Sequence, residues 1–401
     1  NANNSFGSAS GTVSGLSNGL SHMIRTSPTK QEAILAYATG TTLYVLCYDG
    51  TNWLSEWSDT TVNPTNPGIP FDVAYETSSS DVMVLYSNGA TATNEMSYRT
   101  KSGSTGCGSD NWSAASTLDT ARVAGTYPIS WVRLNFDRRT TSTLIAAIWS
   151  DYNRGVSSQI WSGTAWGNEP TTALETNLEP AVGIACTVSG TTNCSRLPQF
   201  DLEFESGGDL MIVWANISGA DGTNGAYYAT CTGGSSSCSW SATSTISSLS
   251  DDAQALDISA NPNSDEVVFA AIGAAGDDLG AAYWDGSTWT GTANLDTVTQ
   301  DPATGGTRIV ATGWLISGAT TRSVIVYADA APFTTSTSWA TGNGSTFATG
   351  TSFRNTPGYN ATHRWYDIQI DPIDKDRLMF TISDNASDVF AKRLVMDSTP
   401  T

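Results

Sequence analysis

Asp285-Gly286-Ser287-Thr288-Trp289 is a short polar turn that runs into an aromatic residue, and the chain contains seven stretches of this kind. The other six are Asn4-Ser5-Phe6, Asp49-Gly50-Thr51-Asn52-Trp53, Asp110-Asn111-Trp112, Ser162-Gly163-Thr164-Ala165-Trp166, Ser237-Cys238-Ser239-Trp240 and Asn343-Gly344-Ser345-Thr346-Phe347. Asp-Gly, Ser-Gly and Asn-Gly pairs tolerate the positive φ of tight hairpins. The repetition therefore indicates a chain built from recurring β-hairpin units.

The spacing of the aromatic residues predicts how these units are arranged. Successive aromatics lie between 47 (Phe6 to Trp53) and 74 residues (Trp166 to Trp240) apart. A repeat of this length, with hairpin turns and no helical stretches, is typical of a β-propeller. We predict an all-β fold, a seven-bladed β-propeller of four-stranded antiparallel blades that forms a single domain over residues 1–401. The blade cores are expected at residues 20–58, 71–119, 130–175, 198–247, 254–296, 306–355 and 365–399 plus 3–14.

The seventh blade needs a strand from the other end of the chain. The 54 residues after Phe347 contain no further turn with an aromatic, whereas the stretch from Ser5 to Thr12 reads like that from Thr346 to Thr351. We therefore predict that the N-terminal strand closes the ring, which removes exposed sheet edges. As an alternative, the same strand enters a neighbouring subunit's open blade, and the chains self-assemble by strand addition.

The composition excludes several kinds of partner. The chain carries 38 acidic and 18 basic residues, which gives a net charge of −20. This excess argues against nucleic acid or an anionic membrane as a partner. No apolar run approaches the roughly 20 residues that cross a bilayer, so we expect no direct membrane span in this chain. Only 14% of the residues are charged, and a surface of hydroxyls and amides suits a secreted, extracellular or cell-surface protein.

The cysteines and the sequons agree with an oxidising compartment. Six cysteines, an even number, suggest disulfides: Cys47, Cys107, Cys186, Cys194, Cys231 and Cys238. The second and third pairs each flank a short polar loop, so we expect local pairing there, and the first two cysteines would then bridge neighbouring blades. Asn-x-Ser/Thr sequons occur about as often as chance predicts, and the candidate glycosylation sites are Asn111, Asn216, Asn343, Asn360 and Asn385.

Two turns resemble those of secreted propellers of the sialidase-like, bacterial-neuraminidase-repeat superfamily. They run from Ile370 to Leu378 and from Tyr283 to Trp289. That family's Asp box reads Ser-x-Asp-x-Gly-x-Thr-Trp, and here Asp285-Gly286 lacks the intervening residue. The resemblance implies a sialidase-like glycoside hydrolase as one alternative, with an arginine triad that clamps a carboxylate. The candidate arginines on inner strands are Arg25, Arg133 and Arg308, and none is followed by the family's Ile-Pro.

The innermost strands of four blades carry an aspartate at an equivalent position. These residues are Asp72, Asp201, Asp257 and Asp367. Two facing acids would suit glycoside hydrolysis. A residue repeated in four blades serves the repeat, however, whereas a catalytic acid occurs once. We therefore expect each aspartate to accept backbone N–H bonds from the adjacent blade, and we assign no catalytic residue.

Calcium is the alternative for a cofactor. Aspartates cluster in three places: Asp371 with Asp374 and Asp376, Asp251 with Asp252, and Asp277 with Asp278. Hard cations prefer such oxygen ligands, but none of the three matches the spacing of a calcium loop, and turns favour Asp for local hydrogen bonding. We assign no metal or cofactor site. The two histidines, His22 and His363, are expected to be structural residues near the start of inner strands.

The aromatic residues offer two roles. Four of them lie on third strands near the rim, where they would stack on sugars or peptides: Tyr48, Tyr98, Trp161 and Tyr283. The seven blade-closing aromatics are expected to pack between blades: Phe6, Trp53, Trp112, Trp166, Trp240, Trp289 and Phe347. We predict a non-catalytic extracellular propeller that recognises protein or glycan at the cell surface, or a subunit of a surface assembly such as a filament. The alternatives are a carbohydrate-active enzyme and a glycan-binding lectin.

Overall fold

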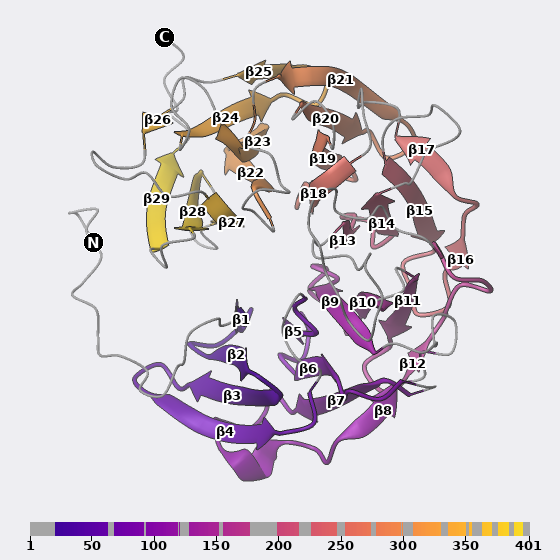
Figure 1. The fold of residues 1–401 in the computed structure, drawn as a ribbon, viewed down its shortest axis with the longest axis vertical. Helices are drawn as coiled ribbons and strands as arrows, with labels where there is room; N and C mark the ends of the chain where they lie inside the picture. Colours follow the sequence, from indigo (N-terminus) through magenta and orange to yellow (C-terminus); the bar gives the residue numbers. More distant parts are fainter. Residues whose placement is uncertain are drawn as a thin grey trace.

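The computed structural model describes most of the chain. The described residues are 21–62, 68–91, 94–118, 120, 128–151, 155–176, 199–215, 226–246, 253–273, 278–297, 299, 308–329, 336–349, 353–354, 363–370, 376–384 and 389–395. They form seven antiparallel sheets placed around a common axis, so the predicted all-β, seven-bladed propeller is confirmed (Figure 1). In this part of the chain no helix is long and apolar enough to cross a membrane.

The first four blades follow the chain order from the inside of the ring to the rim. Blade 1 contains β1 (Ser21–Thr26), β2 (Ala33–Thr39), β3 (Thr42–Tyr48) and β4 (Trp53–Asp59). Blade 2 contains β5 (Phe71–Tyr75), β6 (Val82–Ser87), β7 (Met96–Lys101), the 3₁₀ turn η1 (Ser109–Asn111) and β8 (Ser116–Leu118). Blade 3 contains β9 (Ile129–Phe136), β10 (Ile145–Asp151), β11 (Val156–Trp161) and β12 (Trp166–Gly167). Blade 4 contains β13 (Phe200–Phe204), β14 (Leu210–Ala215), β15 (Ala226–Thr232), β16 (Ser239–Trp240) and β17 (Ser244–Ile246).

The last three blades continue the pattern, except that the seventh has three strands in the described part of the chain. Blade 5 contains β18 (Ala253–Ala260), β19 (Val267–Gly273), β20 (Leu279–Trp284) and β21 (Trp289–Asp296). Blade 6 contains β22 (Val310–Ser317), β23 (Thr320–Asp329), β24 (Ser336–Gly342), β25 (Phe347–Thr349) and β26 (Phe353–Arg354). Blade 7 contains β27 (His363–Ile370), β28 (Arg377–Asp384) and β29 (Val389–Val395), in that order across the sheet.

The second strands of blades 2, 4 and 5 are buried on both faces because each of these blades packs between two others. Every residue of β6, β14 and β19 is buried. Their nearly continuous apolar sequences are what such a position requires, since a strand with one wet face would alternate apolar and polar residues.

The turns that connect third and fourth strands explain the sequence repeat. Gly50, Gly163, Gly286 and Gly344 occupy equivalent places in them, with φ between 91° and 95°, a region that favours glycine. The first residue of the turn closes it with its side chain. In blade 5, for example, Asp285 Oδ1 accepts the backbone N–H groups of Ser287 and Thr288, both over 2.8 Å. These hydrogen bonds lower the pKa of Asp285 to about 2.

The hydrophobic core of the described side chains runs from blade 1 round to blade 7. Four clusters of buried side chains join blades 1 to 4, blades 2 and 3, blades 4 and 5, and blades 5 to 7. Among the side chains that the structure describes, none of these clusters contains residues of both blade 7 and blade 1, a seam across which Figure 1 shows β27–β29 and β1–β4 standing apart. The predicted closing strand, residues 3–14, lies outside the described residues, so closure by the N-terminus stays a prediction.

Candidate functional site

The inner strands place the repeated aspartates around the axis, where they join one blade to the next. Three of the four accept a main-chain N–H from the following blade: Leu134 N to Asp72 Oδ2 (2.9 Å), Ile258 N to Asp201 Oδ2 (3.4 Å) and Thr312 N to Asp257 Oδ2 (2.6 Å). Thr312 Oγ1 also donates to Asp257 Oδ2 over 2.8 Å. The structural role predicted for these aspartates is confirmed at these three positions.

Asp367 differs from the other three aspartates, and here the prediction of a backbone bond to the next blade is wrong for the described residues. Its carboxylate lies 3.8 Å from Arg308 Nη1 and 3.5 Å from the side-chain amide of Gln369, and its side chain is 31% exposed. The blade that would follow it around the ring is blade 1, across the open seam. The physical reason for the difference is therefore that the described part of blade 1 stands apart from blade 7 and brings no backbone N–H within reach of Asp367.

The three inner-strand arginines are ion-pair partners of these aspartates. Arg25 lies 3.4 Å from Asp72, and Arg133 lies 3.0 Å from Asp201. Arg308 is paired with Asp257 and lies 3.9 Å from Asp201. Because each guanidinium is already bound to a carboxylate of the protein, the described geometry is that of a cross-linked scaffold and not of an open clamp for a ligand's carboxylate.

Asp201 and Asp257 share the most strongly perturbed environment at the axis. Burial raises the pKa of Asp257 to about 7, with the nearby charge of Asp201 adding to the effect and Arg308 opposing it. Burial acts on Asp201 in the same direction, but Arg133 and Arg308 together hold its pKa below the ordinary value. Both carboxyl groups face the guanidinium of Arg308, which is paired with Asp257 and lies 3.9 Å from Asp201. Glycoside hydrolysis needs carboxyl groups about 5 Å or more apart, with the sugar between them. Here both carboxyl groups are engaged by Arg308 instead of facing an open site for a sugar.

The blade-closing aromatics pack against the preceding blade, as predicted, in the five later copies. Trp112 Nε1 donates to Glu56 Oε2 (2.7 Å), Trp166 contacts Tyr98 edge-on (6.0 Å), Trp240 Nε1 donates to Asn168 O (2.9 Å), Trp289 contacts Tyr228 (5.8 Å), and Phe347 stacks on Tyr283 (4.3 Å). Trp53 is the exception, because its side chain is 36% exposed and its ring contacts Tyr48 of its own blade. Phe6 lies outside the described residues.

The third-strand aromatics take part in the same packing and are not open platforms for a sugar. Trp161 Nε1 donates to Glu76 Oε1 of the preceding blade over 2.9 Å, and the ring contacts Tyr98. Tyr283 is buried beneath Phe347, and Tyr48 donates its hydroxyl to Gly50 O. On the third strand of blade 5, Trp284 Nε1 donates to Glu205 Oε1 over 3.0 Å, and burial raises the pKa of Glu205 to about 8, with the charges of Asp265 and Asp209 adding to the effect.

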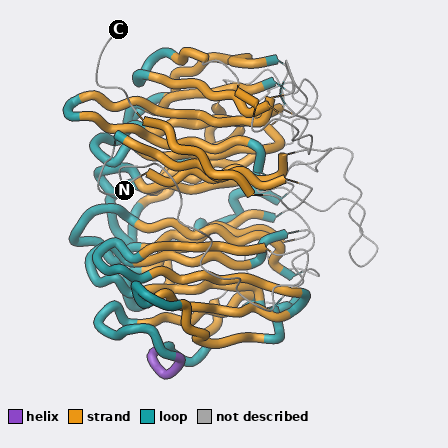
Figure 2. The backbone as a smooth tube through the Cα atoms, turned by 90° about the vertical axis from the view of Figure 1, so that its left-hand side faces the viewer, coloured by secondary structure: helices purple, strands orange, loops and turns teal. Residues whose placement is uncertain are grey.

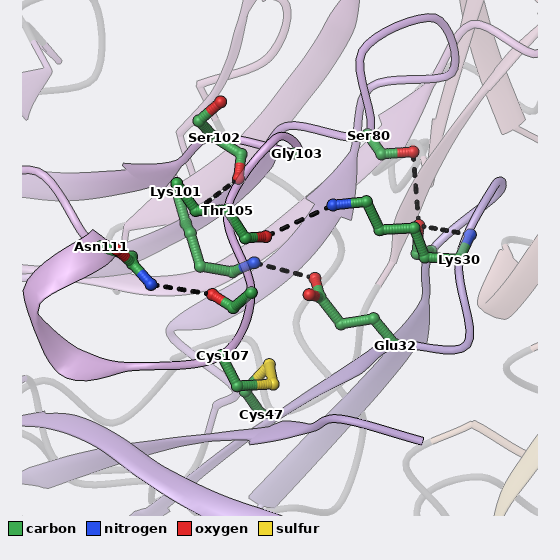
Figure 3. Close-up of polar contacts among 12 residues, drawn as sticks. Lys30, Glu32, Cys47, Ser80, Lys101, Ser102, Gly103, Thr105, Cys107 and Asn111 are labelled. Atoms are coloured by element: carbon green, nitrogen blue, oxygen red, sulfur yellow. Dashed lines mark hydrogen bonds and ion pairs between the residues drawn. A yellow bond between two sulfur atoms is a disulfide. The ribbon is translucent and has the colours of Figure 1, made fainter.

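A buried ion pair and a disulfide fasten blade 1 to blade 2 (Figure 3). Lys101, fully buried, donates from Nζ to Glu32 Oε1 over 2.9 Å, and the Tyr75 hydroxyl donates to the same oxygen over 3.1 Å. Beside them, Cys47 is bonded to Cys107, 60 residues away. Sequence reasoning missed Glu32 and Lys101. The sequence contained a sign of this pair, because Lys101 stands at the end of a third strand, where other blades have a tryptophan, Trp161 or Trp284.

The predicted disulfides are confirmed where they can be seen. Cys47 with Cys107 bridges blades 1 and 2, and Cys231 with Cys238 closes the predicted local loop. Cys186 and Cys194 lie outside the described residues. Two disulfides fit an extracellular protein. The sulfurs of Cys47 and Cys107 lie near the Glu32 carboxylate, but disulfide sulfurs are not the thiolates that bind metals.

The remaining candidates are dispersed. His22 and His363 lie on inner strands, as predicted. Asn111 and Asn343 are exposed, whereas Asn216, Asn360 and Asn385 lie outside the described residues. Of the aspartates proposed for calcium, Asp376 and Asp278 are described, and Asp376 lies 3.6 Å from Arg377. The other five lie outside the described residues: Asp251, Asp252, Asp277, Asp371 and Asp374.

A polar hollow of about 590 Å³ opens between blades 5 and 6, at the end of the blades where Figure 2 shows most of the described loops. Three turns line it: the β18–β19 turn, the β20–β21 turn and the β22–β23 turn of the next blade. The polar side chains of its lining are Asn261, Asn263, Ser264, Asp265, Glu266, Asp285, Ser287 and Thr321. Among the described residues that line it there is no arginine or lysine.

Among the described residues, two carboxylates of the hollow each use a single oxygen for their hydrogen bonds to the protein. Asp265 uses Oδ1 to accept from Ser206 Oγ (2.9 Å) and Gly207 N (2.6 Å). Glu266 uses Oε2 to accept from Asn261 Nδ2 (2.7 Å) and Ser264 Oγ (2.9 Å). These bonds orient both side chains from the protein side. Sequence reasoning missed this site because it depends on how close the turns of two neighbouring blades lie.

Comparisons with known proteins show the fold and no family. No family model and no curated protein matches the chain. Among solved structures, the BP39L lectin from Burkholderia pseudomallei is similar with a TM-score of 0.60 and 10% identity, over 94% of this chain and 95% of that one. The β-propeller domain of the Trilobed protease from Pyrococcus furiosus has a TM-score of 0.48 and 8% identity (95% and 99% covered). The α-L-arabinofuranosidase Arb93A from Fusarium graminearum has 0.45 and 10% (94% and 93% covered). The chain thus has a β-propeller fold, and its likeness to sialidases stays a prediction.

Proposed function

We propose that this chain is a non-catalytic extracellular recognition propeller that binds a glycan in the hollow between blades 5 and 6. The hollow carries the proposal, because its volume suits a small ligand and its lining is made of amide, hydroxyl and carboxylate groups. Sugars present many hydroxyl donors to such acceptors. That one of the similar folds is a lectin agrees with this function.

The charge of the hollow selects among glycans. Asp265, Glu266 and Asp285 are acidic, and no basic side chain in the lining offsets them. Like charges repel, and a desolvated carboxylate without a partner costs free energy. The proposed ligand is therefore a neutral or amino sugar, and sialylated or uronic glycans are excluded. A hydrolase is the less favoured function, because the axial carboxylates are bound to Arg133, Arg308 and the next blade.

Binding to a glycan array followed by titration of the best neutral or amino sugar tests the proposal. Asp265→Asn keeps the Oδ1 acceptor but removes the charge that we expect a sugar hydroxyl to contact. Because hydrogen bonds to charged groups contribute about 1.5–3 kcal/mol, affinity should fall about tenfold or more. Asp110→Asn, an exposed acid on η1 of blade 2, is the matched control and should leave affinity unchanged. Equal binding by the two variants, or selective binding of sialylated glycans, would contradict the proposal.

A further inference from the structure

The open seam exposes apolar side chains that the rest of the ring buries. Three large apolar side chains that are exposed in the described part of the chain lie on the seam side of blades 1 and 7: Ile24 (47%), Trp53 (36%) and Met379 (38%). Leu54 (39%) is also exposed, but it pairs with Cys47 and lies on the face of blade 1 that is turned toward blade 2. Exposed apolar groups gathered in one region mark interaction surfaces. Since the other blades bury their facing sides against each other, blades 7 and 1 offer the two sides of a seventh interface.

Two seam residues, Trp53 and Asp367, occupy positions whose equivalents in other blades contact the adjacent blade. Fourth-strand aromatics pack on the preceding blade, as Phe347 does on Tyr283, but Trp53 has its described ring contact within blade 1. On the inner strands, Asp72, Asp201 and Asp257 each bind the amide of the next blade. By strand register, Ile24 on β1 is the residue whose amide Asp367 would accept from the next blade.

In the described part of the chain, blade 7 has three strands, and the outer fourth strand seen in the other six blades is not among them. β29 pairs with β28 on one side, and no described strand pairs with its other side. An unpaired edge is a template for strand addition. The seam therefore combines an open backbone edge with an exposed apolar face.

The registers of the other blades specify how an added strand would pair. In blades 1, 5 and 6, the aromatic residue of the fourth strand pairs with the last residue of the third strand. The pairs are Trp53 with Tyr48, Trp289 with Trp284, and Phe347 with Gly342. In blade 7, Ile370, Leu378 and Leu394 pair across the three strands at the equivalent level, so Leu394 is the third-strand residue there. If residues 3–14 form the added strand, Phe6 lies opposite Leu394 and Ser8 lies opposite Lys392.

We propose that residues 3–14 of a second copy of this chain add to the outer edge of β29, and that blade 1 of that copy docks on blade 7. Six residues, 15–20, separate the added strand from β1. The same number of residues connects β17, the last strand of blade 4, to β18, the first strand of blade 5. Strand addition therefore brings the second copy's blade 1 onto the seam. This arrangement would bury Ile24 and Met379 and provide Asp367 with the Ile24 amide.

Two observations favour a second copy over the same chain. Within one chain, the described parts of blades 7 and 1 stand apart with their apolar residues exposed. The donor segment also suits contact between two acidic chains, because residues 1–20 contain no charged side chain although each chain carries a net charge of −20. Each copy has one donor and one acceptor, so the contact repeats head to tail and builds an open filament.

Disulfide trapping distinguishes the two arrangements. The full chain is prepared as Ser8→Cys, as Lys392→Cys, and as the double variant, all oxidised under mild conditions. Mixing the two single variants should give a cross-linked heterodimer, and the double variant should give a ladder of covalent oligomers. A register-shifted double variant, Ser8→Cys with Arg393→Cys, should cross-link at least tenfold less, because neighbouring positions on a strand face opposite sides.

The outcomes decide the proposal independently of glycan binding. A mixed heterodimer and a ladder support strand addition between copies, and sedimentation of the unmodified chain should then show mass that increases with concentration. A cross-link confined to single chains would overturn it, because residues 3–14 would then close their own ring. Folded single variants that stay monomeric and do not cross-link would overturn it as well.

Discussion

Glu32→Gln is expected to destabilise the folded chain by about 3–5 kcal/mol, since it leaves a buried ammonium without its charge partner. Lys101 is fully buried and its Nζ donates to Glu32 Oε1 over 2.9 Å. Glutamine keeps an oxygen for the Tyr75 hydroxyl, so the loss should come from the charge of Lys101. Chemical unfolding followed by tryptophan fluorescence, with the Cys47–Cys107 disulfide kept oxidised, measures the free energy of unfolding.

The double variant Glu32→Gln with Lys101→Met is the matched control. Replacing a buried ion pair by groups of similar volume is often nearly neutral, whereas removal of one partner is not. The double variant should therefore recover most of the stability that Glu32→Gln loses. If single and double variants lose the same free energy, the ion pair is not what fastens blade 1 to blade 2.

Arg308→Met is expected to have an effect of similar size, about 3–5 kcal/mol at pH 8. Arg308 neutralises Asp257 and Asp201 at the axis and also approaches Asp367, and its side chain is 10% exposed. Without it, the two buried carboxyl groups of Asp201 and Asp257 lose a shared counter-charge. Unfolding of the variant and of the wild type by denaturant gives the difference in free energy.

The pH dependence of Arg308→Met provides a second check. The folded-state pKa of Asp257, about 7, lies above the ordinary value of 3.8, so the native state holds more protons than the unfolded state between these pH values. The contribution of Asp257 to stability therefore falls as pH rises through this window. Removing Arg308 raises its pKa further, so the variant should lose less stability at pH 5 than at pH 8. Arg322→Met, an exposed arginine on β23, should show no such dependence.

The sequence repeat made the fold predictable, because local hydrogen bonds within each repeated turn determine the hairpins from which the blades are built. Asp285 and its equivalents close the turns with their own side chains, and Gly286 supplies the positive φ, so the sequence contains the cause of each hairpin. The inner aspartates were predictable for a related reason. A residue that recurs once per blade must serve the contact between blades, as Asp72 does with the Leu134 amide.

The contacts that break the repeat were harder to predict. Glu32 and Lys101 lie 69 residues apart and meet only because blades 1 and 2 are neighbours. The hollow between blades 5 and 6 depends on the packing distance of turns such as Asn261 to Glu266 and Gly318 to Thr321, which no local pattern encodes. Arg25, Arg133 and Arg308 were only candidates for the clamp that the sialidase resemblance implies, and the structure shows Arg133 and Arg308 as partners of Asp201 and Asp257.

Assay of a panel of chromogenic glycosides with the wild type and with Asp257→Asn tests most directly whether the axial carboxylates hold the blades together instead of catalysing a reaction. Asparagine retains an oxygen for the Thr312 amide, which Asp257 Oδ2 now binds over 2.6 Å, so the variant should still fold, as circular dichroism can verify. We predict no turnover by either protein. Hydrolysis by the wild type that the folded variant lacks would contradict the account.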